Sequence, residues 1–353
     1  YIKINLSNFS NASIKNIKDY TDNIIRYFAL THLIRKRGNG YYIDIVPARK
    51  TVIETILEKD NGESNHFSSK TDYLDYLNDM NKPELEINNV LLEAEYRIEL
   101  FNMITESNIY LEEIENLENY NLKDLIKLKK RILYKKDKND FLNETGITDI
   151  IYNLEHIRNL DIPPSLALEK WITTSLITLN DAIEIKPNYI SDDENNILFT
   201  APAGTPDIEC YYEEFNSICE VTMLTGRDQW HNEGQPVMRH LKDFIIQNSN
   251  SKENYCLFIA PQIHRDTLNT FWYSVKYEYE GTKLKIIPLS LKRFEEIMYA
   301  LKKLKSNNKN FNRNNIRELF DTICNVETIN NSNDWWTYIN ESFDNWKNNL
   351  INI

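Results

Sequence analysis

The segment Gly204-Thr205-Pro206-Asp207-Ile208-Glu209, followed by Cys219-Glu220-Val221-Thr222, carries the pattern that decides the fold. Both acidic residues border short apolar runs that are typical of strands, and a polar stretch between the runs predicts a tight turn. We therefore expect two adjoining strands, with Asp207 at the start of the first and Glu220 within the second. A third carboxylate, Glu233, follows thirteen residues after Glu220.

Carboxylates on adjoining strands can hold a divalent cation for phosphodiester hydrolysis, because Mg²⁺ is usually bound by one or two carboxylates, waters and substrate oxygens. Side chains alternate along a strand, so Glu220 and Thr222 are expected on one face and Val221 in the core, with the Val221 carbonyl left as a further ligand. The pair of Asp207 and Glu220 is weak evidence alone. With 53 acidic residues in the chain, such pairs arise by chance.

Three residues outside the two strands strengthen the pattern. Glu169 projects from the preceding predicted helix and can supply another carboxylate to the same cluster. Glu233 and His240 lie seven residues apart and share a face if the next helix includes Glu233; alternatively, Gly234 and Pro236 mark the start of that helix. His240 can orient water or contact phosphate, and the alternative is a hydrogen-bonded packing residue.

The C-terminal region, from about residue 150, predicts the element order α-β-β-β-α-β with trailing α and β elements. Ser165 is expected to cap the first helix. A buried strand is expected at Cys256–Ala260, and a final aromatic helix is expected to pack on the domain through Trp335, Trp336 and Trp346. The other strands are expected at residues 197–200, 207–212 and 217–223.

The N-terminal region predicts a helix at about Asn23–Ile34 followed by a hairpin of residues 33–37 and 41–46. The turn Gly38-Asn39-Gly40 favours such a hairpin because its residues tolerate positive φ. A helix leading into a basic hairpin is the arrangement of a winged helix, in which Arg35, Lys36 and Arg37 would touch DNA. The alternative is an ordinary hairpin with a charged edge.

Composition limits the function classes. A chain of 353 residues suggests about two or three domains, and the net charge of −12 argues against a protein that coats nucleic acid indiscriminately. The basic stretch Lys123–Lys138 is interpreted as a solvated helix face, or alternatively as a face toward DNA. The four cysteines have no C-x-x-C spacing, which predicts reduced thiols in a cytoplasmic protein and argues against zinc. No membrane span or signal peptide is expected, and the start at Tyr1 rather than Met predicts a piece of a longer chain.

The quoted segments, together with Thr225-Gly226-Arg227-Asp228-Gln229 and Pro236-Val237-Met238-Arg239-His240-Leu241, resemble the AlwI-type restriction endonucleases of the PD-(D/E)XK superfamily. This family includes type IIS nucleases and site-specific nicking enzymes. The superfamily usually carries a lysine where Thr222 stands, but in this family its absence is normal. The resemblance implies that Asp207, Glu220 and the Val221 carbonyl bind metal, that Glu169 is the additional acidic residue, and that Glu233 and His240 complete the catalytic site.

The resemblance also implies a mixed α/β fold with a PD-(D/E)XK core of order αβββαβ. We expect residues 1–80 to form a winged-helix-like module in a DNA-recognition region, 81–150 a helical linker, and 151–353 the nuclease domain. Arg227, Gln229 and Arg239 lie beside the site and are expected to contact phosphate or bases, or alternatively to form surface salt bridges or loop hydrogen bonds.

The leading hypothesis is a Mg²⁺-dependent, sequence-specific endonuclease acting on double-stranded DNA, with Mn²⁺ as a substitute. A second subunit or a transient dimer would be needed for double-strand cleavage, since one site cuts one strand at a time. Two alternatives stay open: a repair or recombination nuclease of the same fold, and an inert DNA-binding or interaction fragment.

Overall fold

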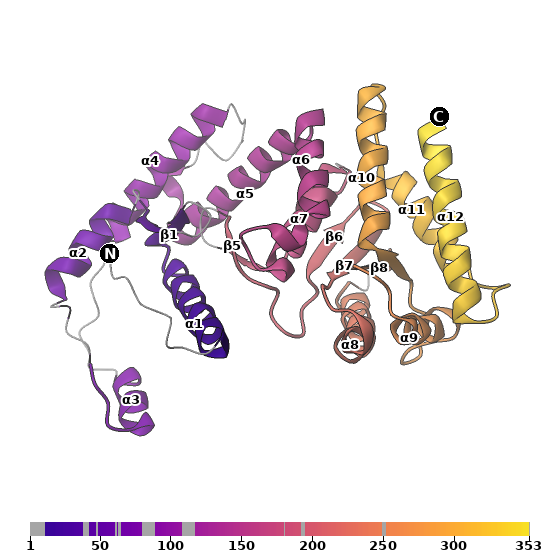
Figure 1. Cartoon of the computed structure of the whole chain (residues 1–353). Helices are drawn as coiled ribbons and strands as arrows, with labels where there is room; N and C mark the ends of the chain where they lie inside the picture. Colours follow the sequence, from indigo (N-terminus) through magenta and orange to yellow (C-terminus); the bar gives the residue numbers. More distant parts are fainter. Residues whose placement is uncertain are drawn as a thin grey trace. The chain divides into compact units, whose positions relative to one another are not determined.

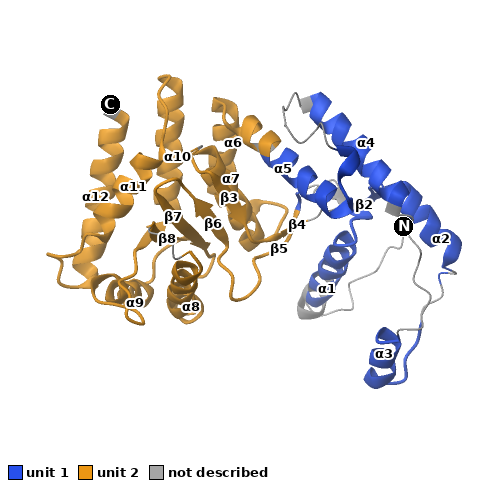
Figure 2. Ribbon diagram, turned by 180° about the vertical axis from the view of Figure 1, so that it is seen from behind, with its two compact units in different colours: residues 1–134, 192–196 blue, residues 135–191, 197–353 orange. Residues whose placement is uncertain are grey.

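The computed structural model describes residues 11–37, 42–46, 49–60, 62, 65–79, 89–107, 117–179, 181–191, 195–248 and 252–352. The chain divides into two compact units, residues 1–134 with 192–196 and residues 135–191 with 197–353 (Figure 2). They are called unit 1 and unit 2. The two units are defined by the compactness of the chain alone. The recognition module, helical linker and nuclease domain expected from the sequence therefore stay predictions.

Unit 1 contains a helix, a hairpin and further helices. These elements are α1 (Asn11–Ala29), β1 (Ile34–Arg37), β2 (Tyr42–Ile45), α2 (Lys50–Lys59), α3 (Lys70–Leu77), α4 (Asn89–Ser107) and the first part of α5 (Leu122–Phe141). The two strands pair antiparallel, as predicted, but the preceding helix ends at Ala29 rather than Ile34. The chain turns there through His32, which has a positive φ of 58°. The predicted turn at residues 38–40 and the side chains of Arg35, Lys36 and Arg37 lie outside the described residues.

The core of unit 1 lies between α4 and α5. It is built by Tyr96, Leu100, Ile104, Leu125, Leu128 and Ile132. Lys129, within the basic stretch, is only 1% exposed, and its Nζ donates to Glu99 Oε1 at 2.8 Å. The stretch is therefore not entirely a solvated face.

Unit 2 is built on a five-stranded mixed sheet with the strand order β3-β6-β7-β8-β9 (Figure 1). Its strands are β3 (Glu184–Pro187), β6 (Ile208–Tyr211), β7 (Phe215–Val221), β8 (Glu253–Ala260) and β9 (Ile286–Ser290). Strands β3, β6 and β7 pair antiparallel, whereas β7, β8 and β9 pair parallel. Strand β8, which lies between β7 and β9, has a continuous apolar run because both of its faces are covered.

Helices cover both faces of this sheet. Helices α8 (Gly226–Gln247) and α9 (Arg265–Lys276) pack together on one face, and α7 (Pro164–Thr178) and α10 (Leu291–Ser306) lie on the other (Figure 1). Helix α6 (Glu144–Glu155) packs on α7 and α10 and is followed by a 3₁₀ turn at Ile157–Asn159. The resulting order α7-β3-β6-β7-α8-β8 confirms the predicted αβββαβ core.

Two local predictions were wrong. The apolar run near residue 197 forms β5 (Ile197–Phe199), which pairs with β4 (Ile190–Ser191) in a separate two-stranded sheet. The first strand of the core is instead β3. Ser165 does not cap α7, because the helix already begins at Pro164.

The C-terminal helix packs on the domain as predicted. Helix α11 (Arg313–Cys324) precedes α12 (Ser332–Asn352), and Trp335 of α12 is fully buried with its indole N–H donating to the Ile323 carbonyl at 3.0 Å. All four cysteines are free thiols, and Cys210, Cys219 and Cys256 are buried. In the part of the chain that the structure describes, no helix has the length and apolar content needed to cross a membrane.

Candidate active site

The hairpin of β6 and β7 brings the first two carboxylates together. Its register pairs Ile208 with Cys219, so one further step places Asp207 opposite Glu220, and side chains opposite each other share a face. Asp207 Oδ2 accepts a hydrogen bond of 2.8 Å from the Val221 N–H. Because the next N–H, of Thr222, donates to Ile259 of β8, the Val221 N–H points to the other side, toward Asp207.

Glu169 reaches the same place from α7. The helix is nearly all buried, and Glu169 is only 4% exposed in its middle. Its Oε2 accepts a hydrogen bond of 3.1 Å from the backbone N–H of Ala201, in the irregular segment before β6. Sequence reasoning missed this backbone donor, since nothing in the sequence of the segment marks it.

Glu233 and His240 both lie inside α8. The helix begins at Gly226, where φ is +62°, and continues through Pro236, so the alternative start at Gly234 or Pro236 was wrong. Their seven-residue spacing therefore places them on one helix face, next to β7. His240 Nδ1 lies 2.8 Å from Glu220 Oε1, whereas the buried Nε2 has no hydrogen-bond partner among the described residues.

Thr222 connects the end of β7 to α8. Its hydroxyl oxygen accepts a hydrogen bond of 3.1 Å from the Leu224 N–H and also bonds to the Glu233 carboxylate. A hydroxyl has a single proton, so with Leu224 as the donor to its oxygen, that proton is available to Glu233. The residue at the expected lysine position thus favours the ionised form of the Glu233 carboxylate.

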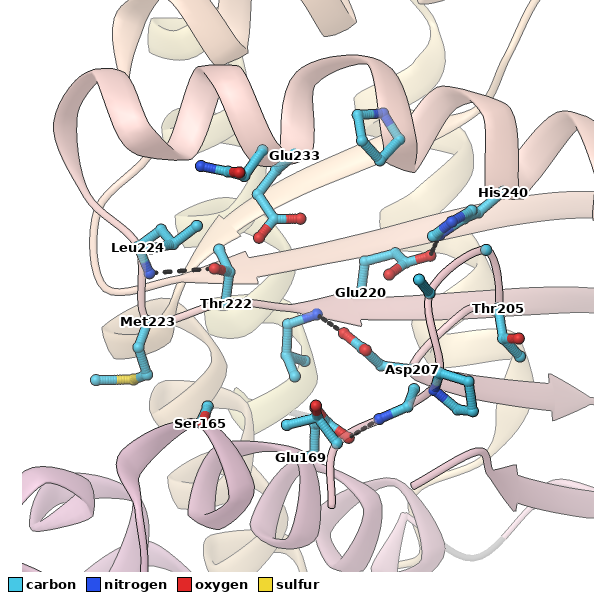
Figure 3. Close-up of a pocket in the computed structure, with 18 of the residues that line it drawn as sticks. Ser165, Glu169, Thr205, Asp207, Glu220, Thr222, Met223, Leu224, Glu233 and His240 are labelled. Atoms are coloured by element: carbon cyan, nitrogen blue, oxygen red, sulfur yellow. Dashed lines mark hydrogen bonds and ion pairs between the residues drawn. The ribbon is translucent and has the colours of Figure 1, made fainter. Parts of the chain in front are cut away.

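These residues line one cavity of about 530 Å³ in unit 2. Figure 3 shows Glu169, Asp207, Glu220 and Glu233 around one space, with the Glu220 carboxylate directed to His240. They come from α7, the residue before β6, β7 and α8. Val221 is half-buried and lines this cavity, so the prediction that it points into the core was wrong. Other lining residues, which the sequence did not single out for the site, are Ser165, Thr205, Met223, Leu224 and Asn232.

The four carboxylates share an unfavourable electrostatic environment. Burial and the nearby Asp207 raise the pKa of Glu169 to about 8. Burial and Glu220 raise the pKa of Asp207 well above its usual range, and burial with Glu233 does the same for Glu220. Burial also raises the pKa of Glu233, against the hydrogen bond from Thr222. A cation in the cavity would relieve this repulsion.

His240 is held in its neutral form. Burial and the adjacent Arg239 lower its pKa, despite the opposing effect of Asp243 and Glu233. One proton therefore lies between His240 Nδ1 and Glu220 Oε1, and the neutral imidazole and the carboxyl group share it. When Glu220 is ionised, the proton is on Nδ1, and Nε2 is an acceptor.

The donor set fits a hard divalent cation. The available groups are carboxylate oxygens and a backbone carbonyl, which are the ligands that Mg²⁺ prefers. Within the described residues, no three His, Cys, Asp or Glu side chains already stand in a metal-binding arrangement. Glu220 is turned toward His240, so metal binding would require a small rotation of the carboxylates.

The predicted DNA contacts divide into two groups. Arg227 and Arg239 are exposed on α8, and Arg239 lines the cavity, so their contact with DNA stays a prediction. Gln229 is fully buried, its Nε2 donates to the carbonyls of Leu224 and Gln262, and its Oε1 accepts from the His264 N–H. Of the two interpretations of Gln229, the contact with DNA was wrong and the loop hydrogen bond is confirmed, because this amide joins two loops.

Comparison with known proteins gives a matching family and likenesses to solved structures. The model of the AlwI restriction endonuclease family matches residues 3–297, which is most of the chain. The crystal structure of the small subunit of the heterodimeric restriction endonuclease R.BspD6I is 22% identical, with a TM-score of 0.48, over 56% of this chain and 98% of the subunit. No curated protein matches the sequence.

Proposed function

Because the chain belongs to the AlwI restriction endonuclease family, we propose that its activity is Mg²⁺-dependent, of the type IIS or nicking kind, and located in the cavity of unit 2. The family is one of site-specific DNA endonucleases. The metal requirement, the subtype and the residue roles are the parts that we infer. We also expect Mn²⁺ to replace Mg²⁺.

One observation carries this proposal: four buried carboxylates from separate elements line a single cavity, and each has a raised pKa. Buried carboxylates are normally paired with a base. Among the salt bridges of the described residues, His240 is the partner of Glu220, and none involves the other three. A cluster that favours protonation or a bound cation is expected at a functional site rather than in a structural core.

Asp207, Glu220 and the Val221 carbonyl are the proposed metal ligands, with Glu169 as the additional carboxylate. A bound Mg²⁺ would polarise the scissile phosphate and lower the pKa of a water molecule. The Val221 N–H holds one oxygen of Asp207, which leaves the other oxygen toward the cavity. The Ala201 N–H fixes Glu169 in the same way.

Glu233 and His240 are the proposed residues that position the attacking water and accept its proton. The hydroxyl of Thr222 orients the Glu233 carboxylate. With its Nδ1–H donated to Glu220, His240 presents Nε2 as a proton acceptor. Both residues lie on one face of α8, so the helix keeps them at a constant separation.

The proposed substrate is double-stranded DNA in the cytoplasm. Arg227 and Arg239 would contact phosphates next to the cavity, and Arg35, Lys36 and Arg37 of the hairpin would contact DNA from unit 1. For cleavage of both strands, the chain would need a second nuclease subunit or a transient dimer, because one site cuts one strand at a time.

Replacement of Glu220 by Gln tests the proposal. Glu220→Gln keeps the shape of the side chain but removes the negative charge, so we expect at least a hundredfold loss of Mg²⁺-dependent plasmid cleavage, on the order of 3 kcal/mol in the barrier. The matched control is Glu295→Gln. Glu295, on α10 outside the cavity, also has a pKa raised by burial and by Glu155.

The control variant is expected to cleave at the wild-type rate. Full activity of Glu220→Gln would contradict the assignment. The remaining alternative is a catalytically inert module. In that case the wild-type chain would cleave no DNA, and calorimetry without DNA would show no binding of Mg²⁺ or Mn²⁺.

A further inference from the structure

We propose that Asn188 is a positioning residue, whose side-chain amide joins Glu209 to the Pro206 carbonyl and thereby holds Asp207 in place. This inference rests on the proposed function of the cavity. Asn188 follows directly after β3 and does not line the cavity, so it would act through Asp207 rather than on the substrate.

Asp207 lies just outside the regular hydrogen-bond ladder of the sheet. It precedes the first residue of β6 and follows an irregular segment in which Gly204 has a φ of +83°. The sheet ladder of β6 begins only at Ile208. The position of the Asp207 carboxylate therefore depends on bonds to the peptide groups on each side of its Cα.

Asn188 supplies those bonds. Its backbone N–H donates to the Asp207 carbonyl at 2.9 Å, which extends the register of β3 and β6 by one residue. Its Nδ2 donates to the Pro206 carbonyl at 2.8 Å, and the same nitrogen donates to Glu209 Oε1 at 2.8 Å. The carbonyls before and after the Asp207 Cα are thus both held by one residue.

Glu209 fixes the orientation of this amide. The carboxylate is nearly buried, and Lys186 Nζ and the Tyr211 hydroxyl also donate to it. Three donors, from Lys186, Asn188 and Tyr211, therefore converge on one carboxylate, and this holds the Asn188 amide in place.

The consequence reaches the cavity through Val221. With its backbone fixed on both sides, Asp207 can place Oδ2 on the Val221 N–H at 2.8 Å. Among the described residues, its other oxygen takes no hydrogen bond and is left for the cation. Outer residues that orient a metal ligand typically change metal affinity or activity by about 10- to 100-fold when removed.

Asn188→Ala, in the full chain, tests the inference with two measurements. Calorimetry with Mg²⁺ in the absence of DNA should show affinity reduced by about tenfold or more. Amide hydrogen exchange, followed by NMR, should show loss of protection at Val221, whose N–H bonds to Asp207. The neighbouring Thr222 amide bonds to β8 instead, so its protection should stay unchanged and serves as an internal reference.

A matched control separates positioning from general stability. Asn254 on β8 also makes side-chain bonds, to the Lys252 carbonyl and to Asn216, but it lies toward the opposite end of the sheet. Asn254→Ala should leave the Val221 amide and Mg²⁺ affinity unchanged. Glu209→Ala should weaken affinity in the same direction as Asn188→Ala, and the double variant should lose less than the sum, because both act on one hydrogen-bonded chain.

The outcomes are distinguishable from failure of the proposed function. If the wild-type chain binds no Mg²⁺ and cuts no DNA, the proposed function fails. Hydrogen exchange of the Val221 amide in Asn188→Ala still tests the positioning role of Asn188. Unchanged protection of Val221 in Asn188→Ala, or an equal loss in Asn254→Ala, would overturn the positioning role.

Discussion

Thr222 is the residue at which this chain departs from the usual nuclease pattern. Two positions after Glu220, a lysine would bring a positive charge into the cavity, whereas the threonine brings a hydroxyl that bonds to Glu233. Its oxygen is also tied to the Leu224 N–H. The chain therefore has the acidic side chain of Glu233, from α8, beside the position at which a lysine was expected.

Thr222→Val is expected to shift the acid limb of cleavage to higher pH. The variant removes the hydrogen bond that lowers the Glu233 pKa, so Glu233 would ionise at higher pH. The freed Leu224 N–H should also cost about 1–3 kcal/mol of stability. Single-turnover cleavage rates over a pH series would measure the shift. Thr222→Ser keeps the hydroxyl and should follow the wild-type profile; an identical profile for Thr222→Val would refute the role.

Among individual residues, the sequence identified the four carboxylates of the cavity but not the backbone and amide groups that hold Glu169 and Asp207. Asp207, Glu220 and Glu233 were found because acidic residues beside apolar runs have a recognisable spacing. The same reasoning could not decide the role of Gln229, since a polar side chain in a loop or first helical turn has the same sequence pattern whether it contacts DNA or closes a buried network. Asn188 had no signal, because its bonds depend on pairing between strands about twenty residues apart.

Among the helices and strands, α7 combines burial in the core with an acidic side chain. It is a nearly all-buried helix in the layer on one side of the sheet, yet it carries Glu169 in its middle. Nothing basic pairs with this carboxylate, whose one hydrogen-bond donor in the described residues is the Ala201 N–H. Folding without a cation therefore favours protonated Glu169.

The metal-free protein should accordingly lose stability as the pH rises. The pKa of Glu169 is raised from 4.5 to about 8 in the folded protein. Proton binding to Glu169 therefore contributes fully to stability below about pH 4.5, and this contribution is lost as the pH rises from there through about 8. At about 1.4 kcal/mol per pKa unit, the loss is at most about 5 kcal/mol. Thermal melting in EDTA at pH 5 and 9 would measure it.

Glu169→Gln provides the comparison for that measurement. The variant should melt at a higher temperature than the wild type at pH 9, with little difference at pH 5. Addition of Mg²⁺ should raise the wild-type melting temperature more than that of the variant. A wild type that is as stable as Glu169→Gln at pH 9 in EDTA would show that Glu169 carries no such penalty.

Elements with strong periodicity were predictable, and short ones were not. The buried run of β8 and the two adjoining strands β6 and β7 were predicted from their apolar patterns. Strand β3 was missed because it is a short edge strand with Ile185 as its one fully buried residue. Strand β5 was recognised as a strand but assigned to the wrong sheet, since three apolar residues do not reveal their partner.

For the whole molecule, the described residues contain one cluster of catalytic candidates, in the cavity of unit 2. We expect supercoiled plasmid to become open-circular first, because a single cavity can act on one strand at a time. The linear form should appear later, with a rate that rises more than proportionally with protein concentration if two chains cooperate. Gel time courses over a concentration series would measure this, and linear product without an open-circular intermediate would contradict it.

Mapping the ends of the same products distinguishes the remaining nuclease class. A site-specific enzyme should give discrete fragments from a long duplex. A repair or recombination nuclease would cut according to DNA structure, so its ends would be scattered on a regular duplex. Scattered ends would therefore argue against sequence recognition by this chain.

The buried amide of Gln229 also has a consequence for loop exchange between relatives. One side chain bonds to Leu224 after β7 and to Gln262 and His264 after β8. The two segments are therefore structurally coupled. A graft of one without the other would leave a buried carbonyl or N–H without its hydrogen-bond partner. Chimeras that transplant residues 222–229 and 261–264 together should fold better than those that carry over either segment alone.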